Sequence, residues 1–176
     1  NGSDVDGINS ASLLNNVTMV SQSTYLFDES IEENLRIARP DATREELESA
    51  CRMASVHDFI LSLPEGYGTR VGAMGDNLSA GEKQMISFAR MVLKNPAVVI
   101  LDEATSSVDS ETEELIQGAL DILLKEKTSF VVAHRLSTIR KADRILYIAN
   151  KGIAESGNHQ ELMAQKGLYY KLNAGA

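Results

Sequence analysis

Residues 98–109, VVILDEATSSVD, decide the fold class. Four apolar residues lead directly into the adjacent carboxylates Asp102 and Glu103. A continuous apolar run of this kind is typical of a strand that is buried on both faces, as in parallel sheets. Ligands of an open parallel sheet bind beyond the carboxyl ends of its strands, which is where the two acids lie. Because the acids are consecutive, one can face a metal while the other faces a water.

The segments on either side of this stretch predict alternating strands and helices. Residues 17–20 (VTMV), 97–101 (AVVIL) and 128–133 (TSFVVA) predict strands, and the last two read as buried. Residues 110–125 predict a helix between the second and third strands. RILYIA and GIAES flank Asn150-Lys151-Gly152, which predicts a C-terminal hairpin, and a short helix follows from about residue 160. This order predicts an α/β fold with a parallel sheet.

Residues 30–94 predict a mostly helical insertion in that sheet. Ser30 and Thr43 are each followed three residues later by a glutamate, which is a capping box, and Ser55 offers a weaker helix start. One face of the helix after Thr43 is predicted to carry the apolar residues Leu47, Ala50, Cys51 and Ala54. A later helix is predicted to carry the apolar stripe Met85, Phe88, Ala89 and Val92 and to stop at Asn95-Pro96.

The start of that later helix, LSAGEKQ (78–84), has two interpretations that the sequence leaves open. In the structural one, Ser79 caps the helix and Glu82 closes a capping box. In the functional one, the same helix N-terminus binds a phosphate, because the Ser79 hydroxyl, Ala80 and Gly81 leave the backbone N–H groups accessible. Glu82 would place a carboxylate beside that phosphate, which counts against anion binding.

Polar residues follow each predicted strand: Gln22, the pair Asp102 and Glu103, and His134. Each has an ordinary alternative, since adjacent acids occur in turns and a single histidine is more often structural. Three such features at one sheet edge favour a site. A carboxylate there can hold a metal while its neighbour acts as a base, and Gln22 can bridge a metal or a water. His134 offers a donor to a γ-phosphate.

The composition excludes some classes of function. A net charge of −8 and a pI near 4.9 argue against nonspecific binding to nucleic acid and against a polybasic membrane anchor. The single cysteine, Cys51, can form no intrachain disulfide and is predicted to be a small buried core residue in a reducing compartment. No apolar run reaches the roughly 18 residues that span a bilayer. If a membrane is involved in the function, we therefore expect a partner to provide the contact with it.

Taken together, these segments resemble the nucleotide-binding domain of ABC transporters in order and spacing. VSQSTYLFDESIEENL resembles the glutamine loop, with Gln22 as its glutamine, and LSAGEKQ resembles the signature motif. VVILDE is similar to Walker B with the catalytic glutamate, SSVD, which ends at Asp109, to the D-loop, and AHR to the switch histidine, His134. TRVGAMG (69–75) resembles a loop typical of exporter-type domains.

The resemblance implies a P-loop NTPase-like parallel sheet with an inserted helical subdomain and a C-terminal hairpin. Residues 1–29 would form a core strand and the glutamine loop, 30–94 the helical subdomain with the signature, and 95–176 the remainder of the core. The implied cofactors are ATP and Mg²⁺. The implied site comprises catalytic residues (Glu103, His134 and Gln22), nucleotide contacts (Ser79, Ala80, Gly81, Glu82 and Asp109) and metal ligands (Asp102 and Gln22).

The sequence departs from the family pattern at several points. Ala80 replaces the first signature glycine, Glu82 replaces the signature glutamine, and Ala73 stands where exporters usually carry a glutamate. None of the 12 glycines is followed by lysine, so the chain lacks a Walker A loop. We therefore expect a domain cut after its P-loop strand, with an incomplete sheet and no ATPase activity of its own.

The family's partners are a second nucleotide-binding domain, arranged head to tail, and a transmembrane domain. The transmembrane domain would touch the region from Gln22 to Leu35, with Tyr25, Leu26 and Phe27 as candidate contacts. Core packing is the alternative role for these three residues. The parent is expected to be an exporter subunit at the cytoplasmic face of the cell membrane. Two alternatives stay open: an ABC-type ATPase that works on DNA or ribosomes, and an inactive interaction fragment.

Overall fold

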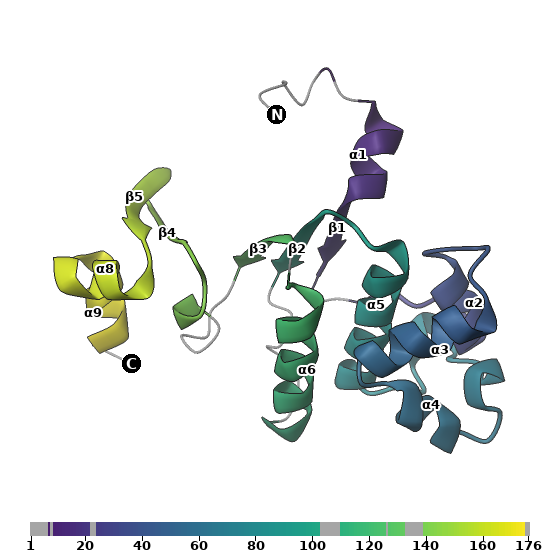
Figure 1. Cartoon of the computed structure of the whole chain (residues 1–176). Helices are drawn as coiled ribbons and strands as arrows, with labels where there is room; N and C mark the ends of the chain where they lie inside the picture. The colour runs from purple at the N-terminus through teal and green to yellow at the C-terminus, as the bar shows by residue number, and fades with distance from the viewer. Residues whose placement is uncertain are drawn as a thin grey trace. The chain divides into compact units, whose positions relative to one another are not determined.

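The computed structural model describes residues 7, 9–21, 24–102, 110–125, 127–132 and 139–174, without the side chains of residues 110–114. The chain divides into two compact units, Asn1–Val132 and Ala133–Ala176, and each is described by itself. Figure 1 shows the helices and strands of both units.

The first unit contains a three-stranded parallel sheet in the order β1-β2-β3. The strands are β1 (Val17–Val20), β2 (Val98–Asp102) and β3 (Thr128–Val132), which confirms the three strands predicted from the sequence. Val20 is paired with Leu101, and Asp102 is paired with Val132. The carboxyl ends of all three strands therefore lie at one edge of the sheet.

Burial in the sheet differs from the prediction for two strands. In β2, Val99 and Leu101 are buried, whereas Val98, Ile100 and Asp102 are only half-buried. All five residues of β3 are exposed, so the prediction of a buried strand at residues 128–132 is wrong. An apolar run shows that a strand can be buried, but the number of neighbouring elements decides whether it is; β3 lies at the edge of the three-stranded sheet.

Three short helices, α2 (Ile31–Arg36), α3 (Arg44–Met53) and α4 (His57–Ser62), follow the first strand. Complete capping boxes at Ser30 and Thr43 begin α2 and α3, as predicted. The predicted helix start at Ser55 is wrong, because α4 has Val56 at its N-cap without a side-chain cap, and Ser55 has a φ of 57°. The 3₁₀ turns Gly66–Gly68 and Ala73–Gly75 lead to the next helix.

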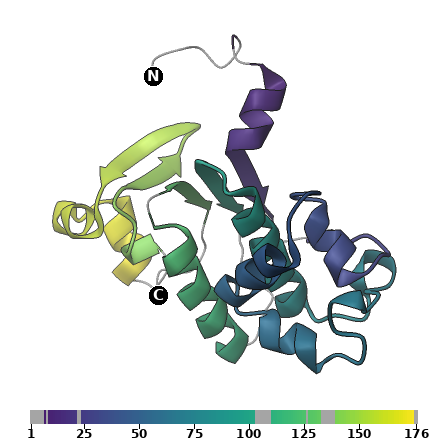
Figure 2. The ribbon, with the colours of Figure 1, turned by 45° about the vertical axis from the view of Figure 1, so that its right-hand side comes forward.

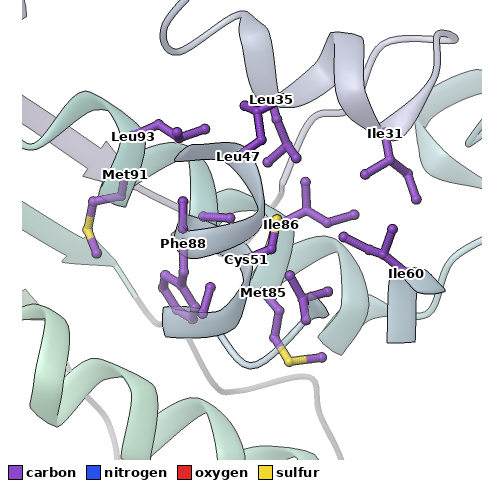
Figure 3. Close-up of a cluster of buried hydrophobic side chains, with 14 of the residues drawn as sticks. Ile31, Leu35, Leu47, Cys51, Ile60, Met85, Ile86, Phe88, Met91 and Leu93 are labelled. Carbon is purple, nitrogen blue, oxygen red and sulfur yellow. The ribbon is translucent and has the colours of Figure 1, made fainter. Parts of the chain in front are cut away.

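The longest helix, α5 (Ala80–Lys94), forms the centre of the packing. It contacts α2, α3, β1 and α6 (Ser110–Leu123), which runs beside it in Figures 1 and 2. Figure 3 shows side chains from α2, α3 and α4 meeting those of α5 in one apolar cluster. The predicted helix end is confirmed, since Asn95 adopts the left-handed conformation at the C-cap. The predicted apolar face of α3 is also buried, namely Leu47, Ala50, Cys51 and Ala54. Helix α6, predicted over residues 110–125, buries Ile116, Ala119, Leu120 and Leu123.

Helix α1 (Ser10–Asn16), which precedes β1, was not predicted, and none of its residues is buried. The second unit contains the predicted hairpin, formed by β4 (Ile145–Ala149) and β5 (Gly152–Gly157). Its turn residues Asn150 and Lys151 both have positive φ, as a tight hairpin requires. Helices α8 (His159–Gln165) and α9 (Leu168–Ala174) complete this unit, with Tyr169 and Leu162 in its small core.

Candidate functional site

The carboxyl edge of the sheet positions the predicted catalytic segments. Asp102 is the last residue of β2 and is half-buried beside the end of β3. Among the predicted catalytic, metal and nucleotide-binding residues, four lie outside the described part of the chain: Gln22, Glu103, Asp109 and His134. The structure does place the strand ends that precede Gln22, Glu103 and His134 next to one another, because the three strands are parallel and in register.

The N-terminus of α5 carries the other predicted nucleotide contacts. The Ser79 hydroxyl accepts a hydrogen bond from the Glu82 amide at 3.3 Å, and the Ser79 amide donates to the Glu82 carboxylate at 2.7 Å. The structural interpretation of this stretch is therefore confirmed as a complete capping box. Ser79 and Ala80 are exposed and Gly81 is buried, so small residues surround an accessible helix end.

This helix end has properties that suit an anion and one that opposes it. The helix dipole places positive partial charge at its N-terminus. One turn beyond Gly81, the side-chain nitrogen of Gln84, Nε2, is buried and has no hydrogen-bond partner among the described residues. The Glu82 carboxylate brings negative charge to the same turn, but its hydrogen bond to Ser79 holds it in the cap. The functional interpretation is compatible with the cap, because both use the same geometry.

The segment after Gln22 presents two aromatic side chains to solvent. Tyr25 is 54% exposed and Phe27 is 46% exposed, and their rings meet edge to face with centroids 4.9 Å apart. Leu26 between them is fully buried. Core packing therefore accounts for Leu26 alone, and the aromatic pair is available as a contact surface.

A buried polar connection behind this pair was not predicted from the sequence. Asn34 on α2 is fully buried, and Arg90 on α5 donates to both its backbone carbonyl and its side-chain oxygen. The signal in the sequence was a polar residue among the inward-facing apolar side chains of each helix. Without a fold, nothing indicated that the two residues would meet.

The single cysteine is not a reactive group of this site. Cys51 is fully buried, and burial raises the pKa of its thiol to about 11. The prediction of a buried core cysteine is therefore confirmed. The neighbouring Tyr67 hydroxyl lies 2.9 Å from Nδ1 of His57, which secures the loop after α4 to that helix.

The described ranges contain neither a cluster of metal-binding side chains nor a membrane-spanning helix. No three His, Cys, Asp or Glu side chains there cluster as a metal site would require. No helix in the same part of the chain combines the length and apolar character needed to cross a membrane.

Comparison with known proteins identifies the family. The sequence pattern of the ABC transporter family matches residues 1–106. A Bacillus subtilis protein with the provisional name multidrug export ATP-binding/permease protein YgaD is 53% identical over 171 residues, which are 97% of this chain and 30% of that protein. A Staphylococcus aureus protein of the same description, SAOUHSC_02003, is 48% identical over the same shares.

A solved structure of a bacterial Atm1-family ABC exporter with ATP bound has the same fold. It superposes with a TM-score of 0.91 at 38% identity, over 98% of this chain and 30% of that one. The chain thus spans about 30% of the length of the relatives that it matches. The chain belongs to the ABC transporter family, and its parallel sheet and helices have the fold of an ABC exporter's nucleotide-binding domain.

Proposed function

We propose that this chain supplies two parts of an ATP-hydrolysing domain that drives export across a membrane. These are the catalytic carboxylates and the signature helix, which is α5 with its capping residue Ser79. The register of the three parallel strands carries the proposal, because it gathers at one edge the ends that lead into Gln22, Glu103 and His134. In this assignment Glu103 acts as the general base toward water, His134 donates to the γ-phosphate, and Asp109 belongs to the D-loop.

ATP with Mg²⁺ is the cofactor that these residues fit. Mg²⁺ bound to ATP takes most of its ligands from phosphates and waters, so one or two protein groups suffice. Asp102, half-buried at the end of β2, is the described carboxylate in that position, and Gln22 is the second proposed ligand. When bound, Mg²⁺ would neutralise charge on the phosphates.

The first turn of α5 is the proposed contact for phosphates held by a second nucleotide-binding domain. Ser79, Ala80 and Gly81 leave room for an anion at this helix end, and the dipole favours negative charge there. Because the 176-residue sequence contains no Gly-Lys pair, a Walker A loop must come from elsewhere in the assembly. Glu82 is proposed to weaken the phosphate contact without abolishing it.

The membrane-spanning part is the second proposed partner, at the cytoplasmic face of the cell membrane. It would contact the region from Gln22 to Leu35, where Tyr25 and Phe27 are exposed. The relatives described as ATP-binding/permease proteins support this arrangement. An ATPase that works on DNA or ribosomes is disfavoured by the net charge of −8.

Protection of position 79 from a thiol reagent tests the nucleotide contact. Ser79→Cys and the control Ser62→Cys, also at an exposed position, would be made in a transporter that carries this chain. Alkylation would be read by mass spectrometry of the cleaved peptides, and Cys51 would contribute little because it is buried. MgATP should slow alkylation at position 79 at least tenfold and leave position 62 unchanged. Equal rates at position 79 with and without MgATP would reject the contact.

A further inference from the structure

Arg90 joins the signature helix to a segment more than fifty residues earlier in the chain. From the third turn of α5, its Nε donates to the Asn34 carbonyl at 2.7 Å and its Nη1 donates to the Tyr25 carbonyl at 2.8 Å. Its Nη2 donates to the side-chain oxygen of Asn34. Three donors of one planar guanidinium thus hold acceptors on two separate segments, which is a geometry that only arginine provides.

Asn34 completes the connection from the other side. Its side-chain oxygen also accepts from the Phe27 amide at 2.9 Å, and its side-chain nitrogen donates to the carbonyls of Phe27 and Ser30, each at 3.0 Å. The backbone of Phe27 is therefore bound in both directions by one fully buried side chain. Arg90 in turn fixes that side chain, so the backbone from Tyr25 to Phe27 is secured to α5.

The connection holds the exposed aromatic pair without using its rings. Leu26 points into the core between the two exposed rings. Gly75, at a φ of +74°, lies against Leu26 and against Lys83 in the first turns of α5, where an added Cβ would come within 3.1 Å and 3.2 Å of their carbons. The segment is therefore connected to α5 at two places: directly through Arg90, and through Gly75, which lies between Leu26 and Lys83.

Packing alone does not require a cation at position 90. Burial lowers the pKa of Arg90 to about 10, and the acceptors that it contacts are neutral amide oxygens rather than carboxylates. Removing part of a charge from water is costly when, as for the half-buried Arg90, the described residues supply no ion-pair partner, and the neighbours Phe88, Ala89 and Met91 on the same helix are apolar. What the guanidinium adds is the fixed spacing between α5, Asn34 and Tyr25.

We propose that Arg90 is a positioning residue that makes the Tyr25–Phe27 pair and the signature helix move as one body. The consequence for transport rests on the proposed function: a push on the aromatic pair by the membrane-spanning part would reach the nucleotide-facing end of α5. The positioning itself depends on neither nucleotide nor membrane. It can therefore be tested on the 176-residue chain alone, at concentrations at which light scattering shows no self-association.

Amide hydrogen exchange and the arginine Nε–H resonance provide that test. Arg90→Lys keeps the positive charge and removes the planar guanidinium with its three donors. Arg52→Lys is the matched control at a side chain that is 57% exposed. Arg90→Lys should speed exchange of the Phe27 amide at least tenfold while amides in the middle of α3 and α5 change less than twofold. Arg52→Lys should change none of them. In the unsubstituted chain, the Arg90 Nε–H should exchange more slowly than that of Arg52.

A second substitution separates positioning from general stability. Asn34→Leu removes the side-chain oxygen that accepts from the Phe27 amide and the nitrogen that donates to the Phe27 and Ser30 carbonyls. It leaves the backbone carbonyl that accepts from the Arg90 Nε–H, so the Phe27 amide should exchange faster while the Arg90 Nε–H resonance persists. Equal acceleration across α3, α5 and Phe27 in Arg90→Lys would show that Arg90 only stabilises the fold and would overturn the proposal. An unchanged Phe27 amide would overturn it as well. Neither result depends on ATP, so failure here is distinct from failure of the proposed function.

Discussion

The Glu82 carboxylate accepts a hydrogen bond from the Ser79 amide at 2.7 Å, and the Ser79 hydroxyl accepts one from the Glu82 amide. The acid that replaces the family's signature glutamine therefore closes the cap of its own helix. A glutamine can make the same bond through its amide oxygen, so the cap does not require the charge. The carboxylate can thus be neutralised with little cost to the fold, while the field at the helix end changes.

The double change Ala80→Gly and Glu82→Gln should raise ATP hydrolysis by a transporter that carries this chain. The glycine gives more room at the helix end, and the glutamine removes a negative charge beside the phosphate. Solvent-exposed charges interact by about 0.2–1 kcal/mol, so relief of the repulsion between Glu82 and the phosphate corresponds to a gain of up to about fivefold. Steady-state ATPase assays would measure it, with Glu45→Gln in the first turn of α3 as the control. No gain, or a loss, would mean that the site is adapted to Ala80 and Glu82.

The helical region should lose stability in acid because two capping carboxylates titrate differently when folded. Hydrogen bonds from the Ser30 side chain and backbone hold the pKa of Glu33 below its ordinary value of 4.5. The bond from Arg39, followed by that from the Thr43 amide, lowers the pKa of Glu46 in the same way. The unfolded chain then binds more protons, so the stabilisation is complete above about pH 4.5 and is lost as the pH falls through the folded pKa values.

Thermal unfolding followed by circular dichroism from pH 7 to pH 3 checks this expectation. The melting temperature should fall below about pH 4.5. Glu33→Gln combined with Glu46→Gln should lower the melting temperature at neutral pH and make the acid-induced drop smaller. Glu45→Gln serves as the control, since Glu45 lies in the same first turn as Glu46 but does not close the cap. If the double variant and the unsubstituted chain lost equal stability in acid, the caps would not be the cause.

The sequence could predict those elements whose signals are local. Ser30, Thr43 and Ser79 each begin a helix with a glutamate three residues later, and all three boxes form. The helix start predicted at Ser55 does not form, because Ser55 lacks that glutamate. The backbone of Ser55 instead adopts a left-handed conformation. The turn at Asn150 and Lys151 was also predictable, because its conformation depends on the residues within it.

The features that were not predictable depend on which elements become neighbours. Phe130 and its flanking residues have the composition of a buried strand, yet β3 is exposed because it forms the sheet edge. The bond between Arg90 and Asn34 joins segments 56 residues apart, and neither residue indicates the other. At the site, the sequence predicted that three strand ends lie at one edge of a parallel sheet. The structure added the strand order β1-β2-β3 and the register between the strands.

The exposed edge at β3 should make the isolated chain self-associate. Phe130, Val131 and Val132 are between 42% and 56% exposed, and an apolar edge strand offers unpaired backbone groups to another chain. Light scattering over a concentration series should show growing mass. Val131→Lys should reduce this self-association, and the control Ile122→Lys, at an exposed side chain of α6, should not. A monomer at all concentrations, with slowly exchanging amides in β3, would contradict this expectation.

Substitution of Glu103 tests whether the residue after β2 is the general base for ATP hydrolysis, as we propose. In a transporter that carries this chain, ATP hydrolysis and ATP binding would be measured on the same preparation of Glu103→Gln, because the amide keeps the shape but cannot accept the proton. Glu65→Gln, an exposed glutamate before the turn Gly66–Gly68, serves as the control. Glu103→Gln should abolish turnover while MgATP binding survives, and the control should behave as the unsubstituted protein. Near-normal hydrolysis by Glu103→Gln would show that Glu103 is a turn residue and would contradict the account.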